Sequence, residues 1–201
     1  ERQQRVFRKM LRFTSFIAFP AMLGLSLIAP ELITITITAK WLPSAHILQI
    51  LAIGGAFIPI TALYSNLIIS KGKSNIFMGN TIILGILQLI VMLTLSPYGL
   101  QTMLTVYVAI NIGWLFIWHY FLYKEIRLPL WKALKDVVPY AGIALFTMAV
   151  TYLFSRQITN IYLLILTKMT VAAIIYTGLM WITGSETFKE SLSYLIRKKK
   201  A

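Results

Sequence analysis

The stretch SNIFMGNTIILGILQLIVMLTLSPYGLQTMLTVYVAINIGWLFIWHYFLY, residues 74–123, contains no Asp, Glu, Lys or Arg. A helix needs about 20 apolar residues to cross the roughly 30 Å hydrocarbon layer of a bilayer. The turn-forming residues Ser96-Pro97-Tyr98-Gly99 divide the stretch into two segments of that length, Ile76–Leu95 and Leu100–Leu122. The pattern therefore predicts two transmembrane helices joined by a tight turn.

Apolar segments on both sides of this pair extend the pattern. The sequence predicts further spans over Ile47–Ser70, Val137–Phe154 and Ile161–Ile182, with a kink at Pro59 in the first of these. Together with a span near the start of the chain, they make a six-helix transmembrane region over residues 13–182. The fold class is thus an all-α membrane protein, a bundle of about six transmembrane helices.

The first span begins near Phe13 and contains Pro20 and Pro30, so its end is ambiguous. It ends either near Ile28 or near Thr38. Residues 33–38 read ITITIT, which has the period of a strand. A lone strand in lipid would leave its backbone unpaired, so we interpret these residues as helix or interfacial turn.

The basic residues indicate how the helices are oriented. Six spans place both termini on the same side of the membrane, and sixteen of the nineteen lysines and arginines then fall on that side or next to it. These are Arg2, Arg5, Arg8, Lys9, Arg12, Lys71, Lys73, Lys124, Arg127, Lys132, Lys135, Lys189, Arg197, Lys198, Lys199 and Lys200. The opposite side holds only Lys40 and Arg156. Positive residues concentrate in cytoplasmic loops, so both termini are expected to be cytoplasmic.

Composition supports the membrane assignment. Hydrophobic residues make up 58% of the chain and charged residues only 12%. The charged residues are too few to cover the surface of a soluble core of this size. The net charge of +13 would suggest nucleic acid in a soluble protein, but here the basic residues sit between apolar runs, so we expect no nucleic-acid partner. The chain opens with Glu1 inside a basic stretch, and we expect it to be the downstream part of a longer polypeptide.

Both ends of the chain have amphipathic character. Residues 1–12 place basic residues on one face of a helix and apolar residues on another, which predicts an interfacial helix. Residues 185–201 carry an apolar stripe that ends in Arg197-Lys198-Lys199-Lys200, which predicts a basic cytoplasmic tail. Both ends are expected to contact anionic membrane lipids, and the tail has docking to a partner as an alternative role.

The order of motifs along the first 75 residues resembles a known family. The motifs are RVFRKMLR (residues 5–12), FPAMLGL (residues 19–25), APELI (residues 29–33), KWLP (residues 40–43), LQILA (residues 48–52) and SKGKS (residues 70–74). They resemble the C-terminal part of bacterial polysaccharide flippases, the Wzx-like branch of the multidrug/oligosaccharidyl-lipid/polysaccharide exporter superfamily. Beyond residue 75 the resemblance rests on hydropathy and on the order of the spans.

The resemblance implies a larger two-lobed transporter of which this chain is the C-terminal part. Such proteins move a lipid-linked oligosaccharide, carried on a polyprenyl diphosphate, across the bacterial inner membrane for synthesis of a surface polysaccharide such as O-antigen or lipopolysaccharide. The implied mechanism is rocking of two lobes around a central site. A coupling cation is a possible further partner.

Residues for enzymatic chemistry are sparse. The six acids do not form a pair inside any span, and the two histidines come without any cysteine, so we expect no catalytic dyad, no metal site and no cofactor. The chain is therefore expected not to be an enzyme.

Polar residues inside the spans are the candidate substrate-binding residues: Lys168, Asn66, Asn80, Gln88 and Asn111. Amides can bond sugar hydroxyls, but amides inside spans also form hydrogen bonds between helices, and both interpretations stay open.

Lys168 is the only charged residue well inside a predicted span, seven residues after Ile161. Its Cα lies roughly 10 Å below the outer end of that helix. Its side chain either snorkels to the outer surface, makes a structural polar contact, or contacts substrate or lipid phosphate. The last two require it to face neighbouring helices.

Two other functions remain open. A cation-coupled multidrug exporter of the same superfamily would need a carboxylate inside the membrane, and the only candidate is Glu31, at the end of the first span. A non-catalytic membrane scaffold in envelope assembly fits the hydropathy equally well and predicts no polar cavity.

Overall fold

The computed structural model describes residues 2–183, and every regular element in that part of the chain is a helix. The elements are α1 (Arg2–Thr36), η1 (Ala39–Trp41), α2 (Pro43–Gly55), α3 (Ile58–Ser70), α4 (Ser74–Leu95), η2 (Ser96–Tyr98), α5 (Leu100–Ile126), α6 (Leu130–Ser155) and α7 (Ile161–Ile182). The predicted tail, residues 185–201, lies outside the described residues.

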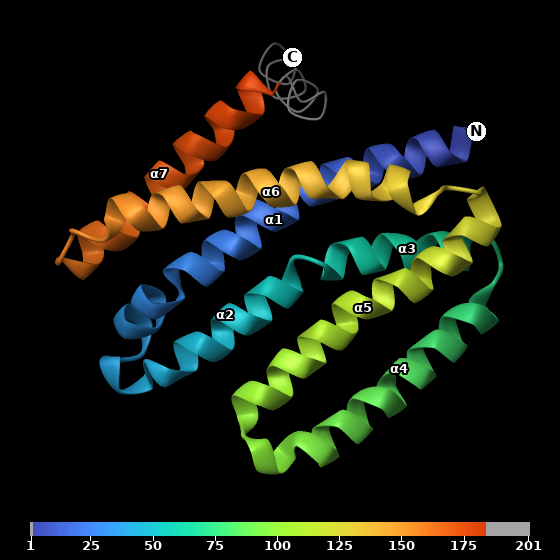
Figure 1. Ribbon diagram of the computed structural model, residues 1–201, viewed down its shortest axis with the longest axis horizontal. Coiled ribbons are helices and arrows are strands. Elements are labelled where there is room, and N and C mark those ends of the chain that lie inside the picture. The colour runs from blue at the N-terminus through green and yellow to red at the C-terminus, as the bar shows by residue number, and fades with distance from the viewer. Residues whose placement is uncertain (1, 184–201) are drawn as a thin grey trace, which may run out of the picture.

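Six helical segments in residues 2–183 are long and apolar enough to cross a membrane: α1, α2 with α3, α4 with η2, α5, α6 and α7. They run alternately up and down, with α7 at one edge of the molecule and α4 at the other (Figure 1). The all-α multi-pass membrane bundle predicted from hydropathy is therefore confirmed, and the tight turn at residues 96–99 is the short helix η2.

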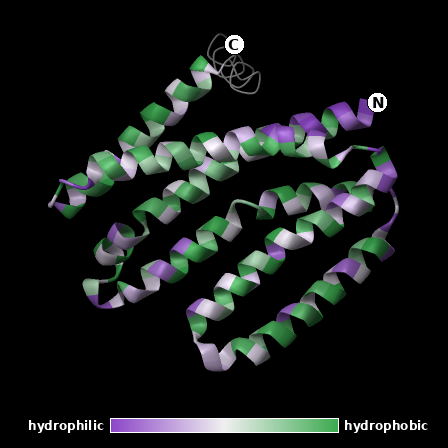
Figure 2. Cartoon of the chain, viewed as in Figure 1, coloured by the Kyte–Doolittle hydropathy of each residue, from purple (hydrophilic) through white to green (hydrophobic). Residues whose placement is uncertain are grey.

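The two ends of the bundle differ in polarity. One end holds the start of α1, the α3–α4 connection and the α5–α6 connection, and we call it the basic end. Hydrophilic residues gather on the first turns of α1 at this end (Figure 2). The opposite end holds the α1–α2, α4–α5 and α6–α7 connections (Figure 1).

Helix α1 is continuous over 35 residues and passes through both Pro20 and Pro30. The ITITIT segment is helical up to Thr36, so the first span takes the longer of its two predicted lengths. The hydroxyls of Thr34 and Thr36 donate to the carbonyl oxygens of residues four earlier, at 2.8 and 2.7 Å. Because the segment is helical up to Thr36, its backbone groups pair within α1 and need no neighbouring strand. The two threonine hydroxyls likewise bond to carbonyl oxygens of their own helix.

Each proline in α1 removes the donor for the carbonyl four residues earlier, and a side chain from a neighbouring helix replaces it. For Pro20 the carbonyl is that of Phe16, which accepts from the hydroxyl of Tyr176 on α7 at 2.8 Å. For Pro30 it is that of Ser26, which accepts from Nε2 of Gln49 on α2 at 3.2 Å. These contacts satisfy both carbonyls inside a membrane span and attach α7 and α2 to α1.

The second span is interrupted between α2 and α3. The predicted kink appears as a break at Ala56 and Phe57, just before Pro59, the second residue of α3. Close packing on α2 immediately precedes this break: a Cβ added to Gly54 would lie 3.0 Å from Val108 of α5, and one added to Gly55 would lie 3.2 Å from Met22 of α1. The glycines therefore let α2 approach two helices at once.

Buried apolar side chains concentrate in the half of the bundle next to the basic end. They come mainly from α1, α3, α5 and α6, and fully buried examples are Leu11, Ile68 and Leu122. By contrast, Asn80 is the only buried residue of α4, which packs chiefly on α5 and α3. The bundle thus has a packed centre around α1 and a lipid-exposed edge at α4.

Removing the side chains that bond the freed carbonyls should weaken the bundle. Tyr176→Phe leaves the Phe16 carbonyl without its donor, and we expect a loss of about 1 kcal/mol in stability, the scale of hydrogen bonds between transmembrane helices. The measurement is equilibrium unfolding of the full-length protein in detergent. Tyr162→Phe is the matched control, because Tyr162 lies on the same helix and is 68% exposed. Equal stability of the two variants would contradict this account of Pro20.

Candidate functional site

Lys168 of α7 is buried between helices and does not face lipid. Its residue is 5% exposed, and its ammonium donates to Oε1 of Glu31 at 2.6 Å and to the carbonyl oxygen of Leu27 at 3.2 Å. Both acceptors belong to α1. This side chain therefore does not snorkel to the headgroups and makes a polar contact with a neighbouring helix. Contact with substrate or lipid phosphate stays a prediction.

Local helix geometry places the three groups together. Leu27 and Glu31 are four residues apart, so they lie on one face of α1. A helical side chain leans toward the N-terminus of its helix. The N-terminus of α7 lies at the end of the bundle away from the basic end, so the side chain of Lys168 leans toward the last turns of α1, which contain Glu31. Glu31 is itself 8% exposed, and because α1 extends to Thr36 it lies inside the span and not at its end.

The charges of this pair cancel, which changes what Lys168 can bind. A lone ammonium would attract a phosphate, but Glu31 already neutralises it at contact distance. The second carboxylate oxygen of Glu31, Oε2, is buried and has no hydrogen-bond donor among residues 2–183. The site therefore combines a neutral ion pair with one unused acceptor, which suits a proton, a hydroxyl or a small cation better than an anion.

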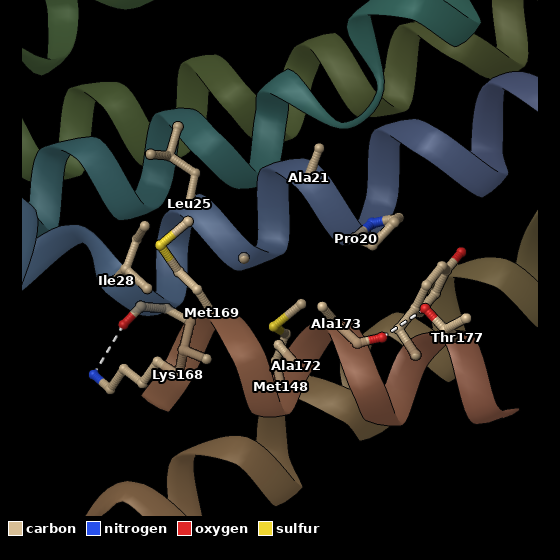
Figure 3. A pocket seen from close by; sticks show the side chains of 13 residues that line it. Pro20, Ala21, Leu25, Ile28, Met148, Lys168, Met169, Ala172, Ala173 and Thr177 are labelled. Atoms are coloured by element: carbon tan, nitrogen blue, oxygen red, sulfur yellow. Dashed lines mark hydrogen bonds between the residues drawn. The ribbon is translucent and has the colours of Figure 1, made fainter. Parts of the chain in front are cut away.

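An apolar pocket of about 480 Å³ adjoins Lys168 between α1 and α7. Figure 3 shows Pro20, Ala21 and Leu25 of α1 on one side, and Ala172 and Ala173 of α7 on the other. The pocket lining is mostly hydrocarbon. The small side chains of Ala172 and Ala173 on α7 leave the space open. Its chemistry matches an alkyl chain or a lipid tail and gives no polar cluster for a sugar.

Two of the predicted site residues are brought together at the other side of the molecule. Nε2 of Gln88 on α4 donates to Oδ1 of Asn111 on α5 at 3.1 Å, and Nδ2 of Asn111 donates to the carbonyl oxygen of Tyr107. This is the interhelical hydrogen bond that amides inside spans were also expected to make. Asn80 is buried on α4 and donates to the carbonyl oxygen of Ile76 in its own helix.

The remaining predicted residue, Asn66, is exposed on α3 near the basic end, where it lines a groove against the first turns of α1. The five predicted residues therefore occupy four separate places. Lys168 lies with α1 and α7, and Asn66 lies beside α1. Gln88 and Asn111 lie between α4 and α5, while Asn80 bonds within α4, two turns from Gln88.

A second charged cluster near the basic end was not singled out from the sequence. Asp136 of α6 is 4% exposed and accepts from Nε and Nη2 of Arg8 at 2.5 and 3.0 Å. Nε of Arg12 lies 3.6 Å from the same carboxylate. The sequence did contain a hint of this contact. Asp136 is an acid directly before a predicted span, and the basic face of residues 1–12 offers Arg8 and Arg12 as partners.

Residues 2–183 contain no group of three His, Cys, Asp or Glu side chains placed to hold a metal ion. Charged groups instead form ion pairs between elements: Asp136 and Lys168 pair with residues of α1, and Lys73 pairs with Glu125 of α5. The geometry fits a transporter-type protein better than a catalyst, because its polar groups lie between helices and not around a reacting centre.

Comparisons with known proteins point to polysaccharide synthesis. Residues 1–46 match the family described as "Polysaccharide biosynthesis protein". An "Uncharacterized membrane protein in cps region" from Klebsiella pneumoniae is 37% identical over 73 residues, which cover 36% of this chain and 15% of that relative. No solved structure matches the chain. These similarities confirm the resemblance to a polysaccharide flippase-like protein that was predicted from the sequence.

Breaking the Glu31–Lys168 pair from either side should destabilise the protein. Lys168→Met leaves a buried carboxylate unpaired, and Glu31→Leu leaves a buried ammonium, each costing roughly 3–5 kcal/mol. The double variant Glu31→Leu/Lys168→Met removes both charges and should recover most of the lost stability. Unfolding of the full-length protein in detergent measures this. Single variants as stable as the wild type would contradict a buried pair.

Proposed function

We propose that the chain is the C-terminal part of a flippase that moves lipid-linked oligosaccharide across the bacterial inner membrane for surface polysaccharide synthesis. The observation that carries the proposal is the similarity of residues 1–46 to a polysaccharide biosynthesis family, together with the similarity of a 73-residue part of the chain to a membrane protein of a cps region. The substrate would be an oligosaccharide on a polyprenyl diphosphate, and the surrounding lipids would be further partners.

The architecture supports transport over chemistry. Six segments can cross a membrane, and the buried charges in the described residues form pairs between helices. We infer that the protein is not an enzyme. Because Glu31 neutralises Lys168, we also infer that the cations that receive the diphosphate lie mainly elsewhere in the transporter.

We further propose that the basic end faces the cytoplasm, on the charge distribution alone. Single cysteines at Ser74 and Lys132, both exposed at the basic end, should then be shielded from an impermeant thiol reagent in intact cells. Cysteines at Gly99 and Thr159, exposed at the opposite end, should react. The material for this test is the full-length protein with any cysteine outside residues 1–201 replaced, because residues 1–201 contain none. Labelling of the first two sites from outside would reverse the orientation.

One observation favours cation coupling as a second candidate function. Glu31 is a carboxylate inside the span, it is buried, and its Oε2 is unused. A multidrug exporter driven by H⁺ or Na⁺ needs such a group. The same group would serve a flippase driven by a cation, so it does not by itself choose the substrate.

Deletion of the gene for the full-length protein separates the two candidate functions. If the protein is the flippase, polyprenyl-linked saccharide should accumulate on the inner leaflet and surface polysaccharide should fall, with dye and antibiotic sensitivity unchanged. The measurement is extraction and sizing of lipid-linked saccharides beside a dye-retention assay. Unchanged surface polysaccharide with raised dye retention would instead support the multidrug exporter.

A further inference from the structure

A groove of about 650 Å³ lies at the basic end between the first turns of α1 and the last turns of α3. Its walls come from two helices that run in opposite directions, and Nζ of Lys71 donates to Oε1 of Gln3 across it at 2.6 Å. This bond ties the helix ends together, so the groove is a formed feature of the bundle.

The groove changes from apolar to polar along its length. On α1 its lining steps back from Met10 through Val6 to Arg2, and on α3 it steps forward from Leu63 to Lys71. Each run covers nine residues, or about 12 Å of helix at about 1.5 Å per step. Because the helices are antiparallel, both runs become polar in the same direction, toward the basic end. The surface therefore matches an amphiphile, with a polar head at one end and a hydrocarbon chain behind it.

The charge in the groove is not compensated by acids in residues 2–183. Elsewhere at the basic end, Lys73 pairs with Glu125, and Arg8 and Arg12 share Asp136. By contrast, Lys71 donates to a neutral amide, and no carboxylate of residues 2–183 pairs with it or with Arg2. The polar end thus presents two positive charges beside the neutral side chains of Asn66 and Ser70.

We propose that this groove binds an anionic phospholipid of the surrounding leaflet. The phosphate lies between Arg2 and Lys71, and an acyl chain lies along the exposed side chains of Val6 and Met10, which are 49% and 51% exposed. Basic side chains attract anionic lipid heads, and the apolar floor removes hydrocarbon from contact with the headgroup region. The proposal does not depend on flippase activity.

The chemistry of the groove selects this occupant over others. Sugar recognition uses exposed aromatic faces. Among residues 2–183, Phe7 is the only aromatic side chain that lines the groove, and it is 3% exposed. An extended protein segment would need hydrogen-bond partners along its whole length, whereas the inner part of the groove is hydrocarbon. A phosphate head with one alkyl chain uses both parts.

Native mass spectrometry of the full-length protein with phosphatidylglycerol tests the proposal. Each lost charge should weaken binding about fivefold, so Arg2→Gln/Lys71→Gln should lose more than about tenfold in apparent affinity. The matched control, Arg5→Gln/Arg127→Gln, removes two exposed charges from the same end without touching the groove lining, and it should bind as the wild type does. Zwitterionic phosphatidylcholine should bind weakly to all three proteins.

Three results would overturn the proposal. The groove variant binding phosphatidylglycerol as the wild type does would remove the role of the two charges. An equal loss in the control would show only general attraction to the basic end. A photoreactive residue at Asn66 should form a lipid adduct in membranes, and formation of a protein adduct instead would assign the groove to a polypeptide. Because lipid binding is read without transport, failure here leaves the flippase proposal standing.

Discussion

The need to satisfy every backbone polar group inside lipid governs how this bundle is assembled. An unpaired carbonyl in hydrocarbon is unfavourable, and α1 contains two prolines that each free one carbonyl. The donors come from Tyr176 on α7 and Gln49 on α2, so the satisfaction of α1 fixes the height of two neighbouring helices. With α7 held at Tyr176, Lys168 lies two turns nearer the opposite end, within reach of Glu31. The ion pair thus depends on the register that Pro20 imposes.

Electrostatics divides the molecule into two regimes. Deep in the bundle, charges are buried only as pairs, because an isolated charge there would cost far more than its partner returns. At the basic end, positive charge exceeds negative charge in the described residues, which is the distribution that retains a segment on the cytoplasmic side. The neutral Glu31–Lys168 pair and the uncompensated Arg2–Lys71 groove are products of these two regimes. The two sites suit different ligands. The Glu31–Lys168 pair suits a proton or a small cation, and the Arg2–Lys71 groove suits an anionic headgroup.

Hydropathy predicted the six spans because burial in lipid requires only length and apolar composition, both of which are local. Pro59 likewise indicated the interruption between α2 and α3, although its exact position depended on the packing of Gly54 and Gly55. The partner of Lys168 was not predicted, since it required knowing that α1 and α7 are neighbours. A signal existed: Lys168 lies seven residues after the start of α7 and Glu31 five before the end of α1, so both sit at similar depth. The amides illustrate the same limit, because only the structure shows that Gln88 faces Asn111.

Helix α1 is the element through which the bundle would act as one body during transport. Lipid tails are as apolar as leucine, so packing between spans has no hydrophobic driving force, and directional contacts carry much of the specificity. Along α1 these contacts follow one another from Arg8–Asp136 through Phe16–Tyr176 and Ser26–Gln49 to Glu31–Lys168. They join α6, α7 and α2 to a single helix at four heights. A group of helices joined in this way resists internal sliding. In the proposed transporter, alternating access would therefore come from rocking of this group against another lobe.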